Sequence, residues 1–199
     1  MMDSAAEKPT REAILDATDR LLRRFGYRKM TIDDLAHEVG IGKGSIYLHF
    51  SSKEEIALSH IDRIIERLKR RLQKLSESDM PPQDRIREML VERVLFRFDS
   101  VQHYSQSLNE LLAHLRPKLL ERRRRYFEEE ARLFAAVIND GIAAGTFRPC
   151  DAELAAQTML LATNALLPYS LSTAELGARS DIEAKVRAIA DMVIEGVSA

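Results

Sequence analysis

The feature that most constrains the fold is a pair of short amphipathic segments, 31–39 and 45–50, joined by a glycine-containing turn. Thr31 can act as a helix N-cap, with Asp34 three residues later as its capping-box partner. Gly40 then ends this helix after about two turns. Apolar residues at helical spacing can lock the two segments together: Ile32, Leu35, Ala36, Val39, Ile46 and Phe50. The sequence therefore predicts two short packed helices joined by a tight turn.

The rest of the chain also shows helical periodicity and no strand alternation. Ala, Leu, Arg and Glu are abundant, whereas Gly and Pro number only 8 and 6 among 199 residues and Trp is absent, which favours helices. The clearest break is the pair Pro81-Pro82, because proline lacks the amide donor that a helix needs. The expected helices are 10–25 (capped by Thr10 and ended by Gly26), 31–39, 45–50, 52–75, 84–102, 105–115, 118–144, 151–167 and 181–197. We expect an all-α fold of about nine helices.

Several classes of protein are disfavoured by what the sequence lacks. The single cysteine, Cys150, can form neither an internal disulfide nor a thiolate metal cage. The five histidines show no metal-ligand spacing, and no catalytic constellation is visible. We therefore expect no enzymatic activity, no cofactor and no bound metal.

Membrane insertion and export are disfavoured as well. The longest apolar stretch, 159–171, is shorter than the roughly 20 residues that a spanning helix requires. The N-terminal residues are polar and acidic and do not resemble a secretory signal. We expect a cytoplasmic protein without a membrane partner.

Charge alone does not favour nucleic-acid binding, because the formal net charge is −1. The run Arg122 to Arg125 is followed by Glu128 to Glu130, and opposite charges three or four residues apart can pair, as Glu128 with Arg132. We interpret this run as a solvated, self-neutralising helix face. DNA binding would require donors concentrated on one local surface.

The two-helix element offers such a surface. A helix-turn-helix lays its second helix in the major groove, and the outward residues of 42–49 supply a cation, hydroxyls, an imidazole and accessible backbone amides. Any two adjacent amphipathic helices would share part of this pattern. The pattern by itself favours DNA binding only modestly.

A family resemblance strengthens this interpretation. The segment from Met30 to Glu55, MTIDDLAHEVGIGKGSIYLHFSSKEE, resembles the DNA-binding signature of the TetR family of transcriptional regulators. The preceding segment, Ala13 to Tyr27, is similar to the first helix of that family. The resemblance covers about the first 60 residues and implies a ligand-responsive repressor that binds operator DNA as a homodimer.

Carried over residue by residue, the resemblance implies a set of DNA contacts. Phosphate contacts are expected from Thr31, Tyr47 and Lys53, and base-reading contacts from Lys43, Ser45 and His49. Gly44 would let the backbone approach closely. Gly42 and Leu48 depart from the polar residues common in relatives, and Leu48 can contact a thymine methyl group. These two positions indicate an operator preference of its own.

The resemblance also divides the chain into a DNA-binding domain, 8–52, and a C-terminal ligand-sensing and dimerisation bundle, 53–199. Aromatic, soft and polar side chains in this bundle are candidates for binding a small-molecule effector, although they are core material first: Phe98, His103, Tyr104, Phe127, Phe134, Met159 and Asn164. The last two helices are expected to form the dimer interface, through Leu154, Met159, Leu166, Ile182, Val186, Ile189 and Val193. The alternative is a helical scaffold or binding protein without regulated DNA binding.

Overall fold

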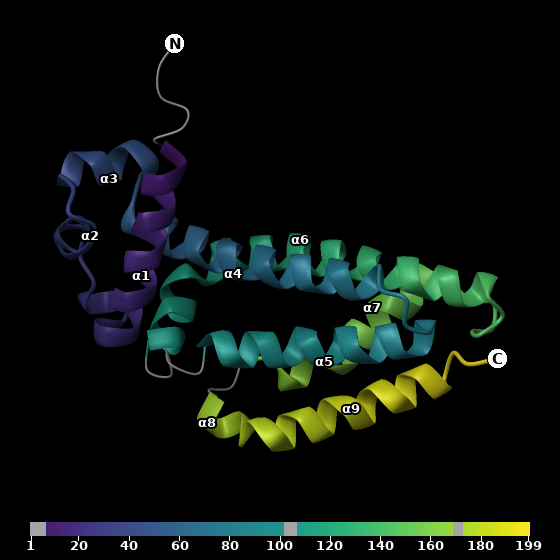
Figure 1. Cartoon of the computed structure of the whole chain (residues 1–199). Helices are drawn as coiled ribbons and strands as arrows, with labels where there is room; N and C mark the ends of the chain where they lie inside the picture. Colours follow the sequence, from purple (N-terminus) through teal and green to yellow (C-terminus); the bar gives the residue numbers. More distant parts are fainter. Residues whose placement is uncertain (1–6, 102–106, 169–172) are drawn as a thin grey trace, which may run out of the picture. The chain divides into compact units, whose positions relative to one another are not determined.

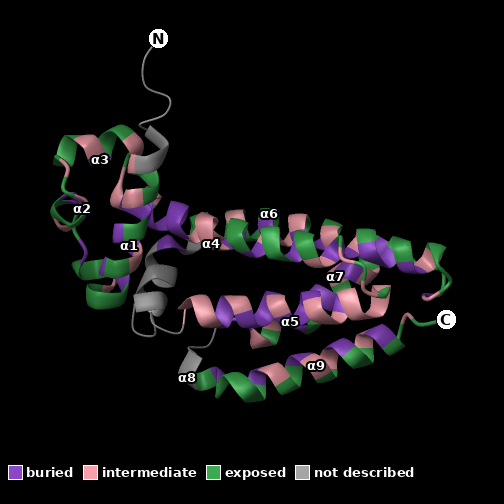
Figure 2. Cartoon of the chain, in the orientation of Figure 1, coloured by how far each residue is buried: buried purple, intermediate pink, exposed green. Residues whose placement is uncertain are grey.

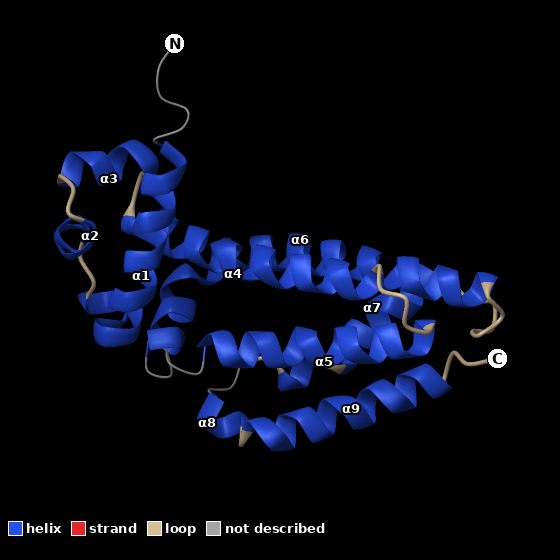
Figure 3. Ribbon diagram, viewed as in Figure 1, coloured by secondary structure: helices blue, strands red, loops and turns tan. Residues whose placement is uncertain are grey.

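The computed structural model describes residues 7–101, 107–168 and 173–199. Throughout these ranges the regular structure is helical, without a β-strand (Figures 1 and 3). The helices are α1 Glu7–Lys29, α2 Ile32–Val39, α3 Lys43–His49, α4 Lys53–Ser76, α5 Pro82–Val101, α6 Ser107–Ala143, α7 Ala152–Ala162, the 3-10 helix η2 Asn164–Leu166, α8 Thr173–Leu176 and α9 Arg179–Glu195. The expected all-α class is confirmed.

The chain forms two compact units. Unit 1 comprises the described residues of 1–64 and 103–119, and unit 2 those of 65–102 and 120–199. The compact N-terminal unit thus extends past residue 52, into the middle of α4. The functional boundary expected at residues 52 and 53 stays a prediction.

Local signals account for the helix ends in unit 1. The Thr31 hydroxyl accepts a hydrogen bond from the Asp34 amide at 3.1 Å, and the Asp34 carboxylate accepts one from the Thr31 amide at 2.9 Å. Gly40 ends α2 with φ 77°, a left-handed conformation that favours glycine. Ser52 accepts a bond from the Glu55 amide at the start of α4. The first two signals were predicted from the sequence.

The first helix begins earlier than expected, and its predicted break at Gly26 is followed by a further short helical segment. α1 begins at Glu7, before Thr10, so Thr10 does not cap it. Gly26 has φ 76° and interrupts the helix, but a further helical segment continues to Lys29. A glycine can turn the chain here without steric cost, and the helix resumes beyond it.

The core of unit 1 lies between α1, α2, α3 and the first half of α4. Leu35 and Ile46 are fully buried, Phe50, Ile32 and Ala36 are nearly so, and Val39 is half-buried. Figure 2 shows the opposite side of α3 as exposed or partly exposed. The predicted apolar contact between the two short helices therefore holds α3 with one face outward.

Unit 2 is built around α5, whose buried residues run from Ile86 to Phe98 (Figure 2). α9 packs along α5 through Ile182, Val186, Ala190 and Ile194. Ion pairs between the two helices flank this contact: Arg87–Asp191 at 2.8 Å, Arg187–Glu88 at 2.9 Å and Arg179–Asp99 at 2.9 Å. One face of α9 is thus committed to the core of its own chain.

Two sequence expectations about the chain after α5 were wrong. The helices expected at 105–115 and 118–144 form one continuous helix, α6, with Pro117 inside it. Proline removes one hydrogen bond from a helix, and the remaining bonds of this 37-residue helix are enough to carry it through. The stretch between the helices expected at 151–167 and 181–197, for which no helix was predicted, contains the short helix α8.

Candidate nucleic-acid interface

The outward side of α3 carries four of the predicted DNA-binding residues. Tyr47 and Leu48 are exposed to 49% and 85%, so both side chains are available to a partner. Lys43 and Gly44 are exposed one turn earlier. We call Lys43, Gly44, Tyr47 and Leu48 the α3 outer face; it offers a cation, a hydroxyl and an apolar side chain.

A carboxylate accompanies the cation of this face. The Lys43 ammonium donates to Asp33 Oδ2 at 2.9 Å, so an ion pair links α3 to the first turn of α2. The hydrogen bond from Lys43 to Asp33 and the negative charge of Asp33 raise the pKa of Lys43. Lys43 is therefore cationic at neutral pH, but its charge is partly compensated within the protein.

The other predicted contacts are less exposed or already engaged. Ser45 and His49 are half-buried, and Gly42 is the exposed N-cap of α3. The exposed Thr31 side chain donates to Asp34 Oδ2 at 2.7 Å within the capping box. The Thr31 hydroxyl thus donates to the Asp34 carboxylate and accepts from the Asp34 amide, so a phosphate contact would require its hydrogen to leave that carboxylate.

Lys53 lies at the first position of α4. Its ammonium donates to the Arg28 carbonyl at 3.2 Å and lies 4.6 Å from the centroid of the Tyr27 ring. Burial lowers the pKa of Lys53. To contact a phosphate, Lys53 would have to leave the Arg28 carbonyl and the Tyr27 ring, or bind the phosphate in addition to them.

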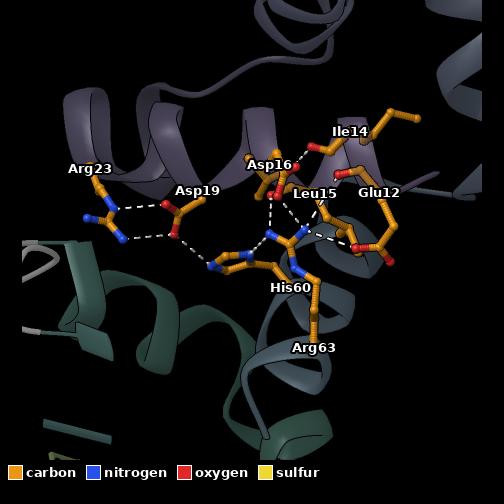
Figure 4. Close-up of polar contacts among 9 residues, drawn as sticks. Glu12, Ile14, Leu15, Asp16, Asp19, Arg23, His60 and Arg63 are labelled. Atoms are coloured by element: carbon orange, nitrogen blue, oxygen red, sulfur yellow. Dashed lines mark hydrogen bonds and ion pairs between the residues drawn. The ribbon is translucent and has the colours of Figure 1, made fainter. Parts of the chain in front are cut away.

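A polar cluster fixes α4 to α1 within unit 1 (Figure 4). The Arg63 guanidinium, with a side chain only 9% exposed, donates to Asp16 at 2.7 Å, to Glu12 at 3.2 Å and to the Leu15 carbonyl at 2.8 Å. The buried His60 ring bridges Arg63, 3.4 Å from Nδ1, and Asp19, 3.5 Å from Nε2. Because a guanidinium only donates, Nδ1 accepts and the ring proton resides on Nε2.

The predicted effector-binding residues separate into core and partly exposed positions. Phe98, Phe134 and Met159 are buried in the core of unit 2, whereas Phe127 and Asn164 are half-buried. His103 and Tyr104 lie outside the described residues. The structure therefore leaves Phe127 and Asn164 as the partly accessible members of that set among the residues described.

A buried ionic cluster in unit 2 was missed by sequence reasoning. Glu130 is 2% exposed and pairs with both Arg93, at 2.8 Å, and Arg97. Arg93 also donates to the Thr163 hydroxyl at 2.8 Å and to Asn164 Oδ1 at 2.9 Å. Burial alone would raise the pKa of Glu130, but the charges of Arg97 and Arg93 outweigh it and hold the pKa below its usual range.

The expectation that Glu128 to Glu130 form a solvated face is wrong for Glu130. Glu128 lies 3.9 Å from Arg124, one turn before it, rather than in the predicted direction toward Arg132. The sequence signal for the buried cluster is the pair Arg93 and Arg97, four residues apart among the apolar residues of α5. A charge pair inside an apolar stripe indicates a buried partner, because a lone buried charge is costly.

Some of the residues expected at a dimer interface are buried, and others are partly or fully exposed. Met159, Ile182 and Val186 are buried in the core of unit 2, so the side chains are already covered within one chain. Leu166, Ile189 and Val193 are half-buried, and Leu154 is exposed. Two large apolar residues outside the predicted set are more exposed than most: Leu161 on α7 and Met192 on α9, the latter to 74%.

Metal-ligating side chains do not gather in the ranges that the structure describes. Among these residues no group of three or more His, Cys, Asp or Glu side chains is placed to hold a metal ion. No helix in the same ranges is long and apolar enough to cross a bilayer.

Comparison with known families matches both parts of the chain. Residues 14–59 match the model described as bacterial regulatory proteins, tetR family, and residues 79–167 match the tetracyclin repressor-like C-terminal domain. The first match contains α2 and α3. It also contains Leu15, Asp16 and Asp19, the α1 residues that contact Arg63 or His60, but not Glu12. The second covers α5 and η2 with the helices between them.

Similar proteins are regulators by name. The repressor KstR2 of Mycobacterium tuberculosis is 26% identical over 146 residues, covering 70% of each chain. A transcriptional regulator from Cytophaga hutchinsonii shares the fold with a TM-score of 0.77, 20% identity and coverage of 94% of this chain and 98% of its own. FadR of Bacillus subtilis, solved in complex with stearoyl-CoA, has a TM-score of 0.67, 17% identity and coverage of 94% and 98%.

Proposed function

Because this chain belongs to the tetR family of bacterial regulatory proteins, we propose that it is a dimeric repressor that binds a palindromic operator and is released by a small molecule. The single observation that carries DNA binding is the α3 outer face, where Lys43, Tyr47 and Leu48 project from a helix anchored by Ile46. A recognition helix needs this division into a packed side and a donor-bearing side. Such a repressor acts in the cytoplasm.

Phosphate and base contacts have different sources in this proposal. The Tyr47 hydroxyl and the backbone amides of the first turn of α2, next to Thr31, position the domain on the phosphates, and Lys43 donates to base edges. Leu48, an 85% exposed apolar side chain on the α3 outer face, contacts a thymine methyl group. The half-buried Ser45 and His49 serve as secondary contacts.

A second copy of the chain completes the operator-binding form. Two recognition helices related by a two-fold axis require two half-sites at matching spacing. We assign the dimer contact to the exposed apolar residues of α7 and α9, because a buried residue cannot meet a partner without unfolding. These residues are Leu154, Leu161 and Met192, with Ile189 and Val193 beside them.

Release by an effector depends on unit 2. Helices α4 and α6 each have residues in both units, so both are continuous elements that can carry a change between them. A ligand that prefers the non-binding arrangement by about 1–3 kcal/mol lowers operator affinity about 5–150-fold. The half-buried Phe127 and Asn164 are the candidates to contact it.

A mobility-shift assay with the DNA upstream of the protein's own coding sequence tests the proposal. The expected result is a complex that forms on this duplex, is weakened by salt and is not displaced by a scrambled competitor of equal length. The rival function, a helical scaffold, predicts equal displacement by both competitors or no complex. Either of these results would contradict regulated DNA binding by this protein.

A further inference from the structure

Asp33 places a negative charge beside a surface that is otherwise suited to a polyanion. Its carboxylate is 70% exposed and accepts a hydrogen bond from the half-exposed Lys43 ammonium at 2.9 Å. The two residues lie on different helices, α2 and α3, ten positions apart. An exposed ion pair adds little to stability, because water screens it.

Helix stability alone does not account for the carboxylate at this position. An acidic residue in the first turn favours a helix, but Asp34, in the same turn, already closes the capping box with Thr31. Asp33 instead directs its carboxylate across to the helix that carries the DNA-facing side chains. Its partner is the one lysine within α3.

We propose that Asp33 is a specificity-determining residue for DNA and that it acts by holding Lys43. This inference rests on the proposed DNA-binding function. An ammonium has three N–H donors, so Lys43 can keep its bond to Asp33 and still donate to a guanine O6 or N7 at a matching sequence. At a non-matching sequence Lys43 can improve its binding only by swinging toward a phosphate, and the bond to Asp33 opposes that movement of the side chain.

The phosphates themselves make this exchange unfavourable on arbitrary DNA. Non-specific binding is almost entirely electrostatic, and a carboxylate near the backbone repels the phosphates and offsets one cation. The carboxylate opposes the phosphates of every sequence, but on a non-matching sequence Asp33 also holds Lys43 back from a phosphate, whereas the matched sequence retains the Lys43 base contact. The ratio of the affinity for the matched sequence to the affinity for other sequences therefore increases.

Substitution of Asp33 by asparagine tests this directly. A preferred duplex is first selected with the wild-type protein from a random-sequence library, and fluorescence anisotropy then compares it with a scrambled duplex at several salt concentrations. For Asp33→Asn we expect affinity for the scrambled duplex to rise about threefold to tenfold, with a salt slope steeper by about one for each additional phosphate that the protein neutralises. Affinity for the selected duplex should change less than about twofold, so the ratio of the two falls.

Two further variants separate this role from a simple change in net charge. Glu38→Gln is the matched control, because Glu38 lies on the same helix and pairs with Arg20 at 2.7 Å instead of with α3. It should leave the ratio unchanged. In a Lys43→Met background, Asp33→Asn should also leave the ratio unchanged, since its partner is absent.

Three outcomes would overturn the inference. In the first, Asp33→Asn raises the affinity for both duplexes equally. In the second, it leaves the ratio of the two affinities unchanged, as Glu38→Gln does. In the third, it still lowers that ratio in the Lys43→Met background. If the wild-type protein selects no sequence from the library, the proposed function fails, and this inference fails with it. A wild-type protein that selects a sequence, together with an Asp33→Asn variant that discriminates equally well, contradicts only the role of Asp33.

Discussion

Arg63 on α4 and Asp16 on α1 are joined by a 2.7 Å ion pair that crosses 47 positions of the sequence. The same guanidinium reaches the Leu15 carbonyl at 2.8 Å, so it binds both a side chain and the backbone of α1. Helix α1 in turn packs on α2 and α3. Within unit 1, the position of α4 is therefore tied to the helices that present the α3 outer face.

Replacing Arg63 by alanine should lower the free energy of unfolding by about 1–3 kcal/mol, because it removes several hydrogen bonds from a charged and largely enclosed donor. Urea denaturation measures this loss. The control is Arg20→Ala, which breaks the exposed Arg20–Glu38 pair and should cost no more than about 1 kcal/mol. Equal losses for the two variants would show that Arg63 is an ordinary surface arginine.

Glu130 should make stability sensitive to acid. Its folded pKa is held below the usual range by Arg97 and Arg93, so the stabilisation is present above the unfolded glutamate pKa of about 4.3 and is lost as the pH falls toward the lower folded value. Glu130→Gln should cost about 3–5 kcal/mol at pH 7, because two buried guanidiniums lose their carboxylate. The variant should also show a flatter decline of stability below pH ~4.3.

Urea titrations of wild type and Glu130→Gln at neutral and acidic pH check both parts of this prediction. Glu128→Gln serves as the control, since the Glu128 side chain is about half exposed and its pair with Arg124 is long, at 3.9 Å. An unchanged stability and an unchanged acid slope in Glu130→Gln would contradict the assignment of a buried charge cluster.

Glycines 44 and 141 should respond oppositely to alanine. A Cβ at Gly44 meets no atom within 4 Å, so helix propensity should maintain or raise stability, while the added methyl group on the α3 outer face should weaken DNA binding. A Cβ at Gly141 would collide with the Phe147 ring, and such overpacking costs about 1–3 kcal/mol. Thermal unfolding and DNA titration of both variants test the separation.

Two results would contradict the predictions for these glycines. If Gly44→Ala binds DNA as tightly as wild type, the α3 N-terminal turn does not approach the duplex. If Gly141→Ala is as stable as wild type, the Phe147 ring can move without cost.

Leu161→Glu should convert the dimer into a monomer. A charge introduced at this exposed position on α7 would be buried without a partner at the interface, at a cost of several kcal/mol. Light scattering measures the mass of the variant, and Leu120→Glu on α6 provides a control at another exposed leucine. A Leu161→Glu protein that stays dimeric would place the interface elsewhere.

Features set by neighbouring residues could be predicted from the sequence. The Thr31 cap and the Gly40 stop depend on contacts within a few positions, and the burial of Leu35 and Ile46 follows from helical spacing. The family resemblance then assigned the exposed side of the second helix to DNA. These features define most of unit 1.

Partners brought together by the fold could not be predicted in this way. Asp33 and Lys43 meet because α2 and α3 pack, and Arg93 and Glu130 are 37 positions apart. The apolar stripe of α9 posed a different difficulty, because a stripe buried in a core and one buried in an interface have the same spacing. The structure assigns Ile182 and Val186 to the core.

The most direct test of the DNA-binding claim is the operator affinity of the double variant Lys43→Ala/Tyr47→Ala, measured by anisotropy alongside its mass in solution. Both side chains lie outside the core, so the variant should remain folded and dimeric. We predict that it loses the sequence-preferring, salt-sensitive complex that the wild-type protein forms. A folded double variant that binds the same duplex with wild-type affinity would contradict the assignment of α3 as the recognition helix.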